Sequence, residues 1–352
     1  MSAMFGSNEN TPLLRVKNLQ TGFKIEGDYY NAVESVSFDV KRKQIVGVVG
    51  ESGCGKSVMS LSIMQLLPEG IGKIRGGEIE FEGENISKLS DKRMNSIRGK
   101  DISMIFQEPM TSLNPVFTIG YQIAEVILNH ENLTKKEARL RSVSLLKQVG
   151  IPRAEQIVTE YPHQLSGGMR QRVMIAMAIA CQPKLLIADE PTTALDVTVQ
   201  AQILELLKGV QEANDMSIIL ITHDLGVVAE ICDEVLVMYA GKIIERAPVE
   251  ELFAAPKHPY TELLMKAIPK MDEEVEKLAT IEGLVPSVIN MPQVGCRFAN
   301  RCPKAMPECM TVTPQLVDVG HEHEAACLLF DESWPADRKR DKDRDREGVT
   351  AL

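Results

Sequence analysis

The strongest structural signal in this chain of 352 residues is the stretch Gly50-Glu51-Ser52-Gly53-Cys54-Gly55-Lys56-Ser57. It fits the pattern G-x-x-x-x-G-K-[ST] of a phosphate-binding loop, the P-loop. An apolar run at residues 45–49 precedes the loop, and residues 57–64, which can form a helix, follow it. Glycines let backbone N–H groups curl inward around an anion, and the start of a helix adds a favourable field. The stretch therefore predicts a phosphate site in a strand–loop–helix unit rather than a plain glycine-rich turn.

Two side chains of the loop have predicted roles at a nucleoside triphosphate. Lys56 is expected to reach the β- and γ-phosphates of ATP, and the Ser57 hydroxyl is expected to ligate Mg²⁺.

Composition and charge narrow the class of protein. The composition is that of an ordinary soluble globular protein, and the formal net charge of -10 argues against nucleic-acid binding through a basic face. No apolar run approaches the roughly 18 residues of a membrane span, and residues 1–8 lack the basic start and apolar core of a secretory signal. We expect a cytoplasmic chain that reaches a membrane only through partner subunits.

Alternating apolar residues on both sides of the loop predict a β-rich subdomain. Residues 14–19, 33–40 and 76–83 have the pattern of strands, and residues 27–30 have that of a turn. Tyr29 or Tyr30 can stack on adenine, but either can equally cover the sheet edge, and both interpretations stay open.

The middle of the chain predicts helices. Apolar residues between 119 and 150 recur at helical spacing, and the stretch 165–172 opens a new helix. Ser166, Gly167 and Gly168 at that helix start form a second possible anion site, with a plain helix N-cap as the alternative.

A predicted buried strand at residues 184–191 ends in two carboxylates. Asp189 at its end can hold Mg²⁺, and Glu190 can polarise a water molecule aimed at the γ-phosphate. Gln107 follows another strand and suits a ligand of Mg²⁺ or of the attacking water, although such a glutamine is often only a surface residue. His223, after the apolar strand 217–222, can bond the γ-phosphate or be structural.

Together these motifs resemble the ATP-binding subunits of ABC transporters. The loop looks like the family's Walker A motif, Gln107 matches the Q-loop, and residues 165–169 resemble the LSGGQ signature with Met169 in place of glutamine. Residues 185–190 look like Walker B with its catalytic glutamate, Asp196 matches the D-loop, and His223 matches the switch histidine. The resemblance implies an α/β P-loop NTPase fold of the ABC type, with an antiparallel β-subdomain and a helical subdomain.

The same resemblance implies a partner chain. In the family two nucleotide-binding domains face head to tail, so Ser166 to Gly168 would cap an ATP held by the other domain. This chain carries one set of motifs, which implies a second, homologous ATPase subunit in a heterodimer.

A narrower resemblance concerns residues 107–115 and 258–261, which look like the dipeptide/oligopeptide and nickel importer branch. That branch implies two permease subunits, an extracytoplasmic peptide-binding protein and a position at the cytoplasmic face of the membrane. Nickel remains an alternative substrate. A soluble ABC ATPase of translation or DNA repair is the rival class, but such proteins usually carry two nucleotide domains or a long coiled coil.

Four cysteines near the end of the chain suggest a metal centre. They are Cys296, Cys302, Cys309 and Cys327. Their spacing lacks the close pairs of structural zinc sites, and the resemblance to the importer tail implies a [4Fe–4S] cluster, with Zn²⁺ or four free thiols as alternatives. His321 and His323 are further possible ligands, although solvated positions are the simpler interpretation.

The expected organisation has four parts. A flexible start spans residues 1–12, and a nucleotide-binding domain spans 13–255, with its helical subdomain at about 108–170. A cysteine-rich extension spans 256–330, and a charged, disordered tail spans 331–352.

Overall fold

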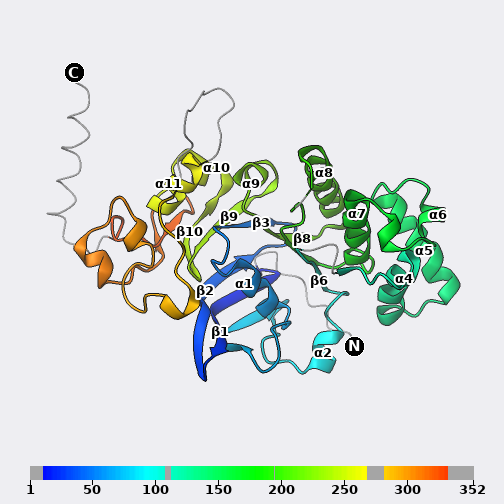
Figure 1. Cartoon of the computed structure of the whole chain (residues 1–352), viewed down its shortest axis with the longest axis horizontal. Helices are drawn as coiled ribbons and strands as arrows, with labels where there is room; N and C mark the ends of the chain where they lie inside the picture. The colour runs from blue at the N-terminus through cyan, green and yellow to red at the C-terminus, as the bar shows by residue number, and fades with distance from the viewer. Residues whose placement is uncertain (1–10, 108–111, 194, 268–280, 332–352) are drawn as a thin grey trace, which may run out of the picture.

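The computed structural model describes residues 11–107, 112–193, 195–267 and 281–331. Its main sheet has the strand order β11-β12-β10-β9-β3-β8-β7-β6 (Figure 1). The parallel centre consists of β9 (Glu234–Tyr239), β3 (Ile45–Val49), β8 (Ser217–Ile221), β7 (Leu185–Asp189) and β6 (Ile102–Ile105). All residues of β3, β7, β8 and β9 are buried, which explains why these strands read as continuous apolar runs.

Alternate residues of the central strands supply two separate cores. Ile45 and Val49 of β3 pack into the core that lies beneath the helices, whereas Val46 and Val48 pack into the core shared with the second sheet. Strand β3 therefore lies between two cores, and the loop that follows β3 begins near the centre of the molecule.

The second sheet is antiparallel and has the order β2-β1-β4-β5. Its strands are β1 (Leu14–Ile25), β2 (Asp28–Val40), β4 (Gly72–Phe81) and β5 (Glu84–Asn85). The three strands predicted in this region are confirmed, and each is longer than expected. The turn predicted at residues 27–30 is wrong after Gly27, because Tyr29 and Tyr30 belong to β2 and pair with Lys24 and Phe23.

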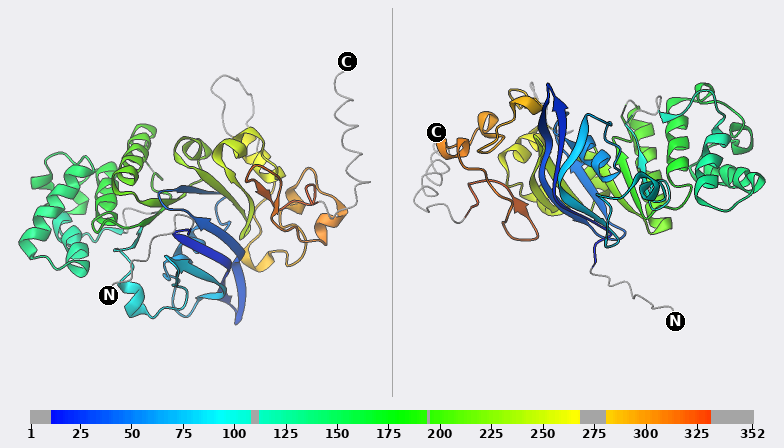
Figure 2. Two further views of the ribbon diagram at one scale, coloured as in Figure 1. Left: turned by 180° about the vertical axis from the view of Figure 1, so that it is seen from behind. Right: turned by 90° about the horizontal axis from the view of Figure 1, so that it is seen from below.

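Four helices form a block at one end of the molecule (Figures 1 and 2). They are α4 (Ile119–His130), α5 (Lys135–Gln148), α6 (Ala154–Ile157) and α7 (Gly167–Ala178). The helical region predicted between residues 119 and 150 forms two helices, α4 and α5, because Thr134 begins α5 with a capping box to Glu137. A short helix, α2 (Asp91–Asn95), lies nearer the second sheet.

The region after β7 alternates helices and strands. Helix α8 (Val197–Asn214) leads to β8, α9 (Leu225–Ile231) leads to β9, and β10 (Lys242–Pro248) pairs antiparallel with β9. The sequence predicts helices from about residue 249 to residue 278, and the first of them begins at Val249, after β10. Helices α10 (Val249–Ala254) and α11 (Pro259–Lys266) then follow, and the rest of the helix expected up to residue 278 lies largely outside the described residues.

Residues 281–331 lie at the end of the molecule opposite α4–α6 (Figures 1 and 2). Their elements are three 3₁₀ turns, η2 (Val288–Asn290), η3 (Ala299–Arg301) and η4 (Pro307–Met310), and two short strands, β11 (Val317–Asp318) and β12 (Glu324–Ala325). Strand β12 pairs with β10, so this segment extends the main sheet.

A buried hydrogen bond between side chains fastens the segment to the sheet. His323 Nε2 lies 2.7 Å from Glu245 Oε1, and the two side chains are only 1% and 0% exposed. The solvated position expected for His321 is confirmed, but the one expected for His323 is wrong, because Glu245 holds it inside. The flexible start and charged tail fall mainly outside the described residues, and no described helix is both long and apolar enough to cross a membrane.

Candidate nucleotide site

The P-loop connects β3 to α1 (Lys56–Ile63), and glycine is required at two of its positions. Gly50 has a φ of 152°, and a Cβ there would lie 2.2 Å from the Met238 carbonyl oxygen. Gly55 has a φ of 107°, and its Cβ would lie 2.7 Å from the Ala32 oxygen. Gly55 also begins α1 without any side-chain cap. The first N–H groups of the helix therefore face the loop, as phosphate binding requires.

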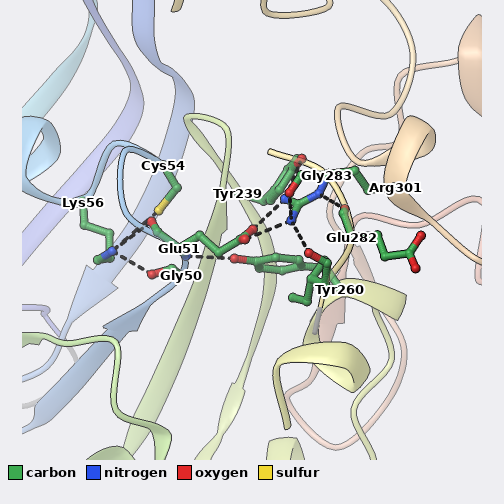
Figure 3. Close-up of polar contacts among 10 residues, drawn as sticks. Gly50, Glu51, Cys54, Lys56, Tyr239, Tyr260, Glu282, Gly283 and Arg301 are labelled. Atoms are coloured by element: carbon green, nitrogen blue, oxygen red, sulfur yellow. Dashed lines mark hydrogen bonds and ion pairs between the residues drawn. The ribbon is translucent and has the colours of Figure 1, made fainter. Parts of the chain in front are cut away.

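Lys56 lies inside the loop and is 5% exposed. Its Nζ donates to Gly50 O at 2.7 Å and to Glu51 O at 3.2 Å, and it lies 3.9 Å from Cys54 Sγ (Figure 3). Burial raises the pKa of Cys54, although the Lys56 ammonium opposes this effect. Cys54 is accordingly a packed, neutral thiol, and the Lys56 ammonium is the buried positive charge of the loop.

Asp189 ends β7 beside this loop and is 4% exposed. Its Oδ1 atom is buried with no hydrogen-bond partner, while the carboxylate is also hydrogen-bonded to Ser57. Burial raises the pKa of Asp189, the Ser57 hydrogen bond and the Lys56 charge lower it, and the Glu190 charge raises it. An unpartnered carboxylate oxygen next to a hydroxyl is a hard oxygen donor set, so Asp189 and Ser57 fit Mg²⁺.

Glu190 is the point at which three of the predicted residues meet. Its Oε2 atom accepts from Gln107 Nε2 at 2.9 Å and lies 3.7 Å from His223 Nδ1. Thr193 also donates to this oxygen at 3.0 Å. Glu190 has a positive φ of 47° and is anchored by its N–H to Ile221 O at 2.9 Å. The turn after β7 thus aims the carboxylate at Gln107 and His223. Thr193 was missed, and only its closeness to Glu190 in the sequence pointed to it.

The signature residues occupy a different surface. Ser166 begins α7 and accepts a hydrogen bond from Met169 N, and Asp196 begins α8 in the same way, accepting from Val199 N. Ser166, Gly167 and Asp196 are exposed. The N-cap alternative for Ser166 is therefore realised, and the exposed backbone of Gly167 leaves the surface open to a second molecule.

The aromatic residues proposed for adenine lie on β2. Arg75 lies over the Tyr29 ring, with 5.7 Å between Cζ and the ring centroid, and Tyr29 is 38% exposed. Tyr30 is half-buried. Adenine stacking by either residue stays a prediction.

The structure also brings distant residues to the loop that sequence reasoning missed. The Arg301 guanidinium binds both carboxylate oxygens of Glu51, at 2.7 and 2.9 Å, and the Tyr260 hydroxyl accepts from Glu51 N at 2.9 Å (Figure 3). The motif at residues 258–261 contains Tyr260 but gives no sign of its contact with the loop, and Arg301 stands 250 positions after Glu51. Only correlated variation among relatives would have linked them.

The structure does not support the metal centre expected at the four C-terminal cysteines. The cysteines come near one another, since Cys296 N donates to Cys309 O at 2.7 Å, and burial raises the pKa of Cys296 to about 11 and that of Cys327 to about 12. Within the four described ranges, no group of three or more His, Cys, Asp or Glu side chains is arranged to hold a metal ion. A [4Fe–4S] cluster or a zinc site is therefore not supported.

A phosphate loop after β3, an aspartate with an unpartnered oxygen at the end of the parallel strand β7, and a glutamate in contact with a glutamine and a histidine define an ATP-binding cassette. The family model described as ABC transporter matches residues 33–193, and the model described as oligopeptide/dipeptide transporter, C-terminal region, matches residues 244–309. The chain belongs to the ABC transporter family, among the ATP-binding subunits of its oligopeptide/dipeptide branch. The predicted P-loop NTPase fold of the ABC type and the ATPase activity are thereby confirmed.

Similar proteins cover nearly the whole chain. The oligopeptide transport ATP-binding protein AppD of Bacillus subtilis is 55% identical over 320 residues, which is 91% of this chain and 97% of that protein. The dipeptide transport ATP-binding protein DppD of Escherichia coli is 47% identical over 315 residues, 90% of this chain and 96% of that protein. Among solved structures, a dimeric ATP-binding cassette in a post-hydrolysis state with ADP and Pi matches with a TM-score of 0.61 and 27% identity. That match covers 67% of this chain and 98% of the other.

Proposed function

We propose that this chain is the ATP-hydrolysing subunit of an importer for dipeptides and oligopeptides. The observation that carries the proposal is the meeting of Gln107 and His223 at Glu190, next to the Ser57–Asp189 pair. The names of the relatives specify the substrate, since they are described as oligopeptide and dipeptide transport proteins. These names favour peptides over nickel.

The chemistry of the proposed reaction is phosphoryl transfer from ATP to water, which yields ADP and phosphate. Lys56 and the N–H groups at the start of α1 hold the phosphates, and Ser57 and Asp189 would hold Mg²⁺, which would neutralise the phosphate charge when bound. Glu190 accepts a hydrogen bond from the attacking water, and Gln107 and His223 keep its carboxylate oriented. Because Gln107 and Thr193 bind the same oxygen of Glu190, the other oxygen remains for the water.

Two copies of this fold are needed for a complete site in our proposal. Ser166 and Gly167, which are exposed, cap with Gly168 the γ-phosphate of an ATP held by the partner subunit, and the partner's signature caps the ATP held here. Asp196 lies at the junction between them. The dimeric state of the similar solved cassette supports this arrangement.

The helical block supplies the contact with permease subunits in our proposal. Val116 is 70% exposed, and the rings of Phe117 and Tyr121 stack 4.7 Å apart on the same surface. A cavity of about 670 Å³ lies beside Tyr121, between α4 and α5. An apolar, hollowed surface of this kind suits an inserted helix of a membrane subunit. The chain is then peripheral to the cytoplasmic face, and a peptide-binding protein delivers the substrate from outside.

Transport by the reconstituted complex tests the proposal. We expect proteoliposomes that contain this chain, its partner ATPase and the permeases to accumulate labelled dipeptides or oligopeptides when MgATP and the binding protein are supplied. Uptake of Ni²⁺ without peptide uptake would contradict the substrate, and co-purification with ribosomes or DNA instead of permeases would contradict the class. A metal centre at the cysteines is left out of this proposal, because the described residues contain no metal-holding group.

A further inference from the structure

The C-terminal segment reaches the nucleotide site through one buried side chain. Arg301 is only 6% exposed, and both of its terminal nitrogens bind the Glu51 carboxylate, which is 28% exposed. Two parallel N–H···O bonds between a guanidinium and a carboxylate fix the distance and the orientation of both groups. Glu51 is the second residue of the P-loop, so this contact acts on the loop itself.

Further contacts hold the Arg301 guanidinium in place. Its Nε donates to Glu282 O at 2.8 Å, and its terminal nitrogens donate to backbone oxygens of residues 281 and 283 and to the Tyr239 hydroxyl. Its Cζ also lies 5.7 Å from the Tyr239 ring centroid and 6.0 Å from that of Phe298. Figure 3 shows the guanidinium between Glu51 and the 282–283 backbone.

A second contact fixes the backbone of the same loop residue. Tyr260, fully buried on α11, accepts the N–H of Glu51 at 2.9 Å, and its ring packs against Tyr239 and Phe298. The Glu51 carbonyl in turn accepts from Lys56 Nζ at 3.2 Å. The path from the C-terminal segment to the phosphate-binding lysine therefore passes through a single residue, Glu51.

We propose that Arg301 is a positioning residue for the P-loop, and that it neutralises Glu51 so that the loop can accept a nucleoside triphosphate. Without the guanidinium, Glu51 places an uncompensated negative charge within a loop that binds a polyanion. Two negative charges that come close together in a partly buried site repel each other strongly. The inference rests on the proposed nucleotide site, and it adds a role for the C-terminal segment in ATP binding.

The test is the affinity of the full-length chain for MgATP, measured by titration with a fluorescent ATP analogue and competition with ATP. Arg301→Ala should raise the Kd about tenfold, which corresponds to about 1.4 kcal/mol. The double variant Arg301→Ala/Glu51→Gln should recover most of that loss, since the unpaired charge is gone. The Kd of Arg301→Lys should lie between those of the natural chain and Arg301→Ala, because one ammonium cannot make the paired contact.

Controls separate this role from simple loss of structure. Lys304 lies in the same segment as Arg301 but forms its ion pair with Glu262 of α11, away from the loop. Lys304→Ala should therefore leave the Kd for MgATP unchanged. Thermal unfolding of each variant reports folding. An Arg301→Ala chain that is folded and binds ATP normally would overturn the inference, as would a loss of affinity that Glu51→Gln does not restore. Lys56→Ala with normal affinity would instead overturn the nucleotide site itself.

Discussion

Gln107 and Glu190 stand 83 positions apart in the chain, and a 2.9 Å hydrogen bond joins Gln107 Nε2 to Glu190 Oε2. Gln107 follows β6 and Glu190 follows β7, which are parallel neighbours in the main sheet. The two residues meet because the carboxyl ends of parallel strands share one edge of the sheet. The contact joins the ends of these two strands at the residue that we propose orients water.

Glu190→Gln should abolish turnover while preserving ATP binding. The amide keeps the shape of the side chain but cannot accept a proton from water, and loss of a general base costs about 10²- to 10⁴-fold in rate. Phosphate release by the assembled complex and the Kd for MgATP are the measurements. Glu205→Gln, at an exposed position of α8, is the matched control. Unchanged hydrolysis by Glu190→Gln would remove our role for this carboxylate.

Lys56→Ala should weaken nucleotide binding. The ammonium is the buried positive charge of the loop, and its loss leaves the phosphates without that partner. We expect a rise in the Kd for MgATP of at least about tenfold, equal to about 1.4 kcal/mol. Lys43→Ala removes a lysine that is 61% exposed and should have no effect on affinity. Equal affinities for the two variants would contradict the assignment.

Gly167→Asp should separate ATP binding from turnover. Gly167 is exposed and a Cβ there meets only Leu195, at 3.8 Å, so the variant should fold. A carboxylate at this position would repel the γ-phosphate held by the partner subunit, and complex turnover should fall at least about tenfold. The isolated chain should keep its own ATP affinity. Gly209→Asp, where a Cβ meets nothing within 4 Å, is the control. Loss of affinity in the isolated Gly167→Asp chain would argue that the signature acts on its own loop.

Acid should destabilise the fold through His258. Burial lowers the pKa of His258 to about 4 from its ordinary value of 6.5, and its Nδ1 accepts the N–H of Tyr260. Between pH 6.5 and 4 the unfolded chain binds a proton at this residue and the folded chain does not. The free energy of unfolding therefore falls as the pH is lowered through this window, by about 3 kcal/mol in total.

His258→Asn tests this pH dependence, because asparagine can still cap α11 but does not titrate. Urea unfolding at several pH values between 7 and 5 should show a shallower decline for the variant than for the natural chain. His163→Asn, at an exposed position, serves as the control. Burial raises the pKa of Glu245, and hydrogen bonds, first of all from His323, lower it more, so the net pKa lies below 4.5. Its contribution is lost only at lower pH, outside the range measured. Parallel pH profiles of His258→Asn and the natural chain would contradict the prediction.

The sequence predicted most of the cassette because its signals are local. The P-loop, the buried strand before Glu190 and the N-cap at Ser166 each depend on neighbouring residues, and the structure contains all three. The placement of His323 and Arg301 depends instead on contacts across the whole chain. His323 was expected in solvent because nothing near it in the sequence reveals Glu245. The expected metal centre rested on cysteine spacing and on the resemblance to the importer tail, and neither specifies where the thiols point.

The pairing of Arg301 with Glu51 also has a consequence for how the protein is made. Chains fold from the N-terminus as they leave the ribosome. The P-loop emerges about 250 residues before the guanidinium that balances Glu51 is synthesised. A nascent or truncated subunit thus carries the loop with its acid unpaired. On our proposal, the full affinity for the nucleotide arrives only with the last part of the chain, so incomplete subunits should bind cellular ATP more weakly than complete ones.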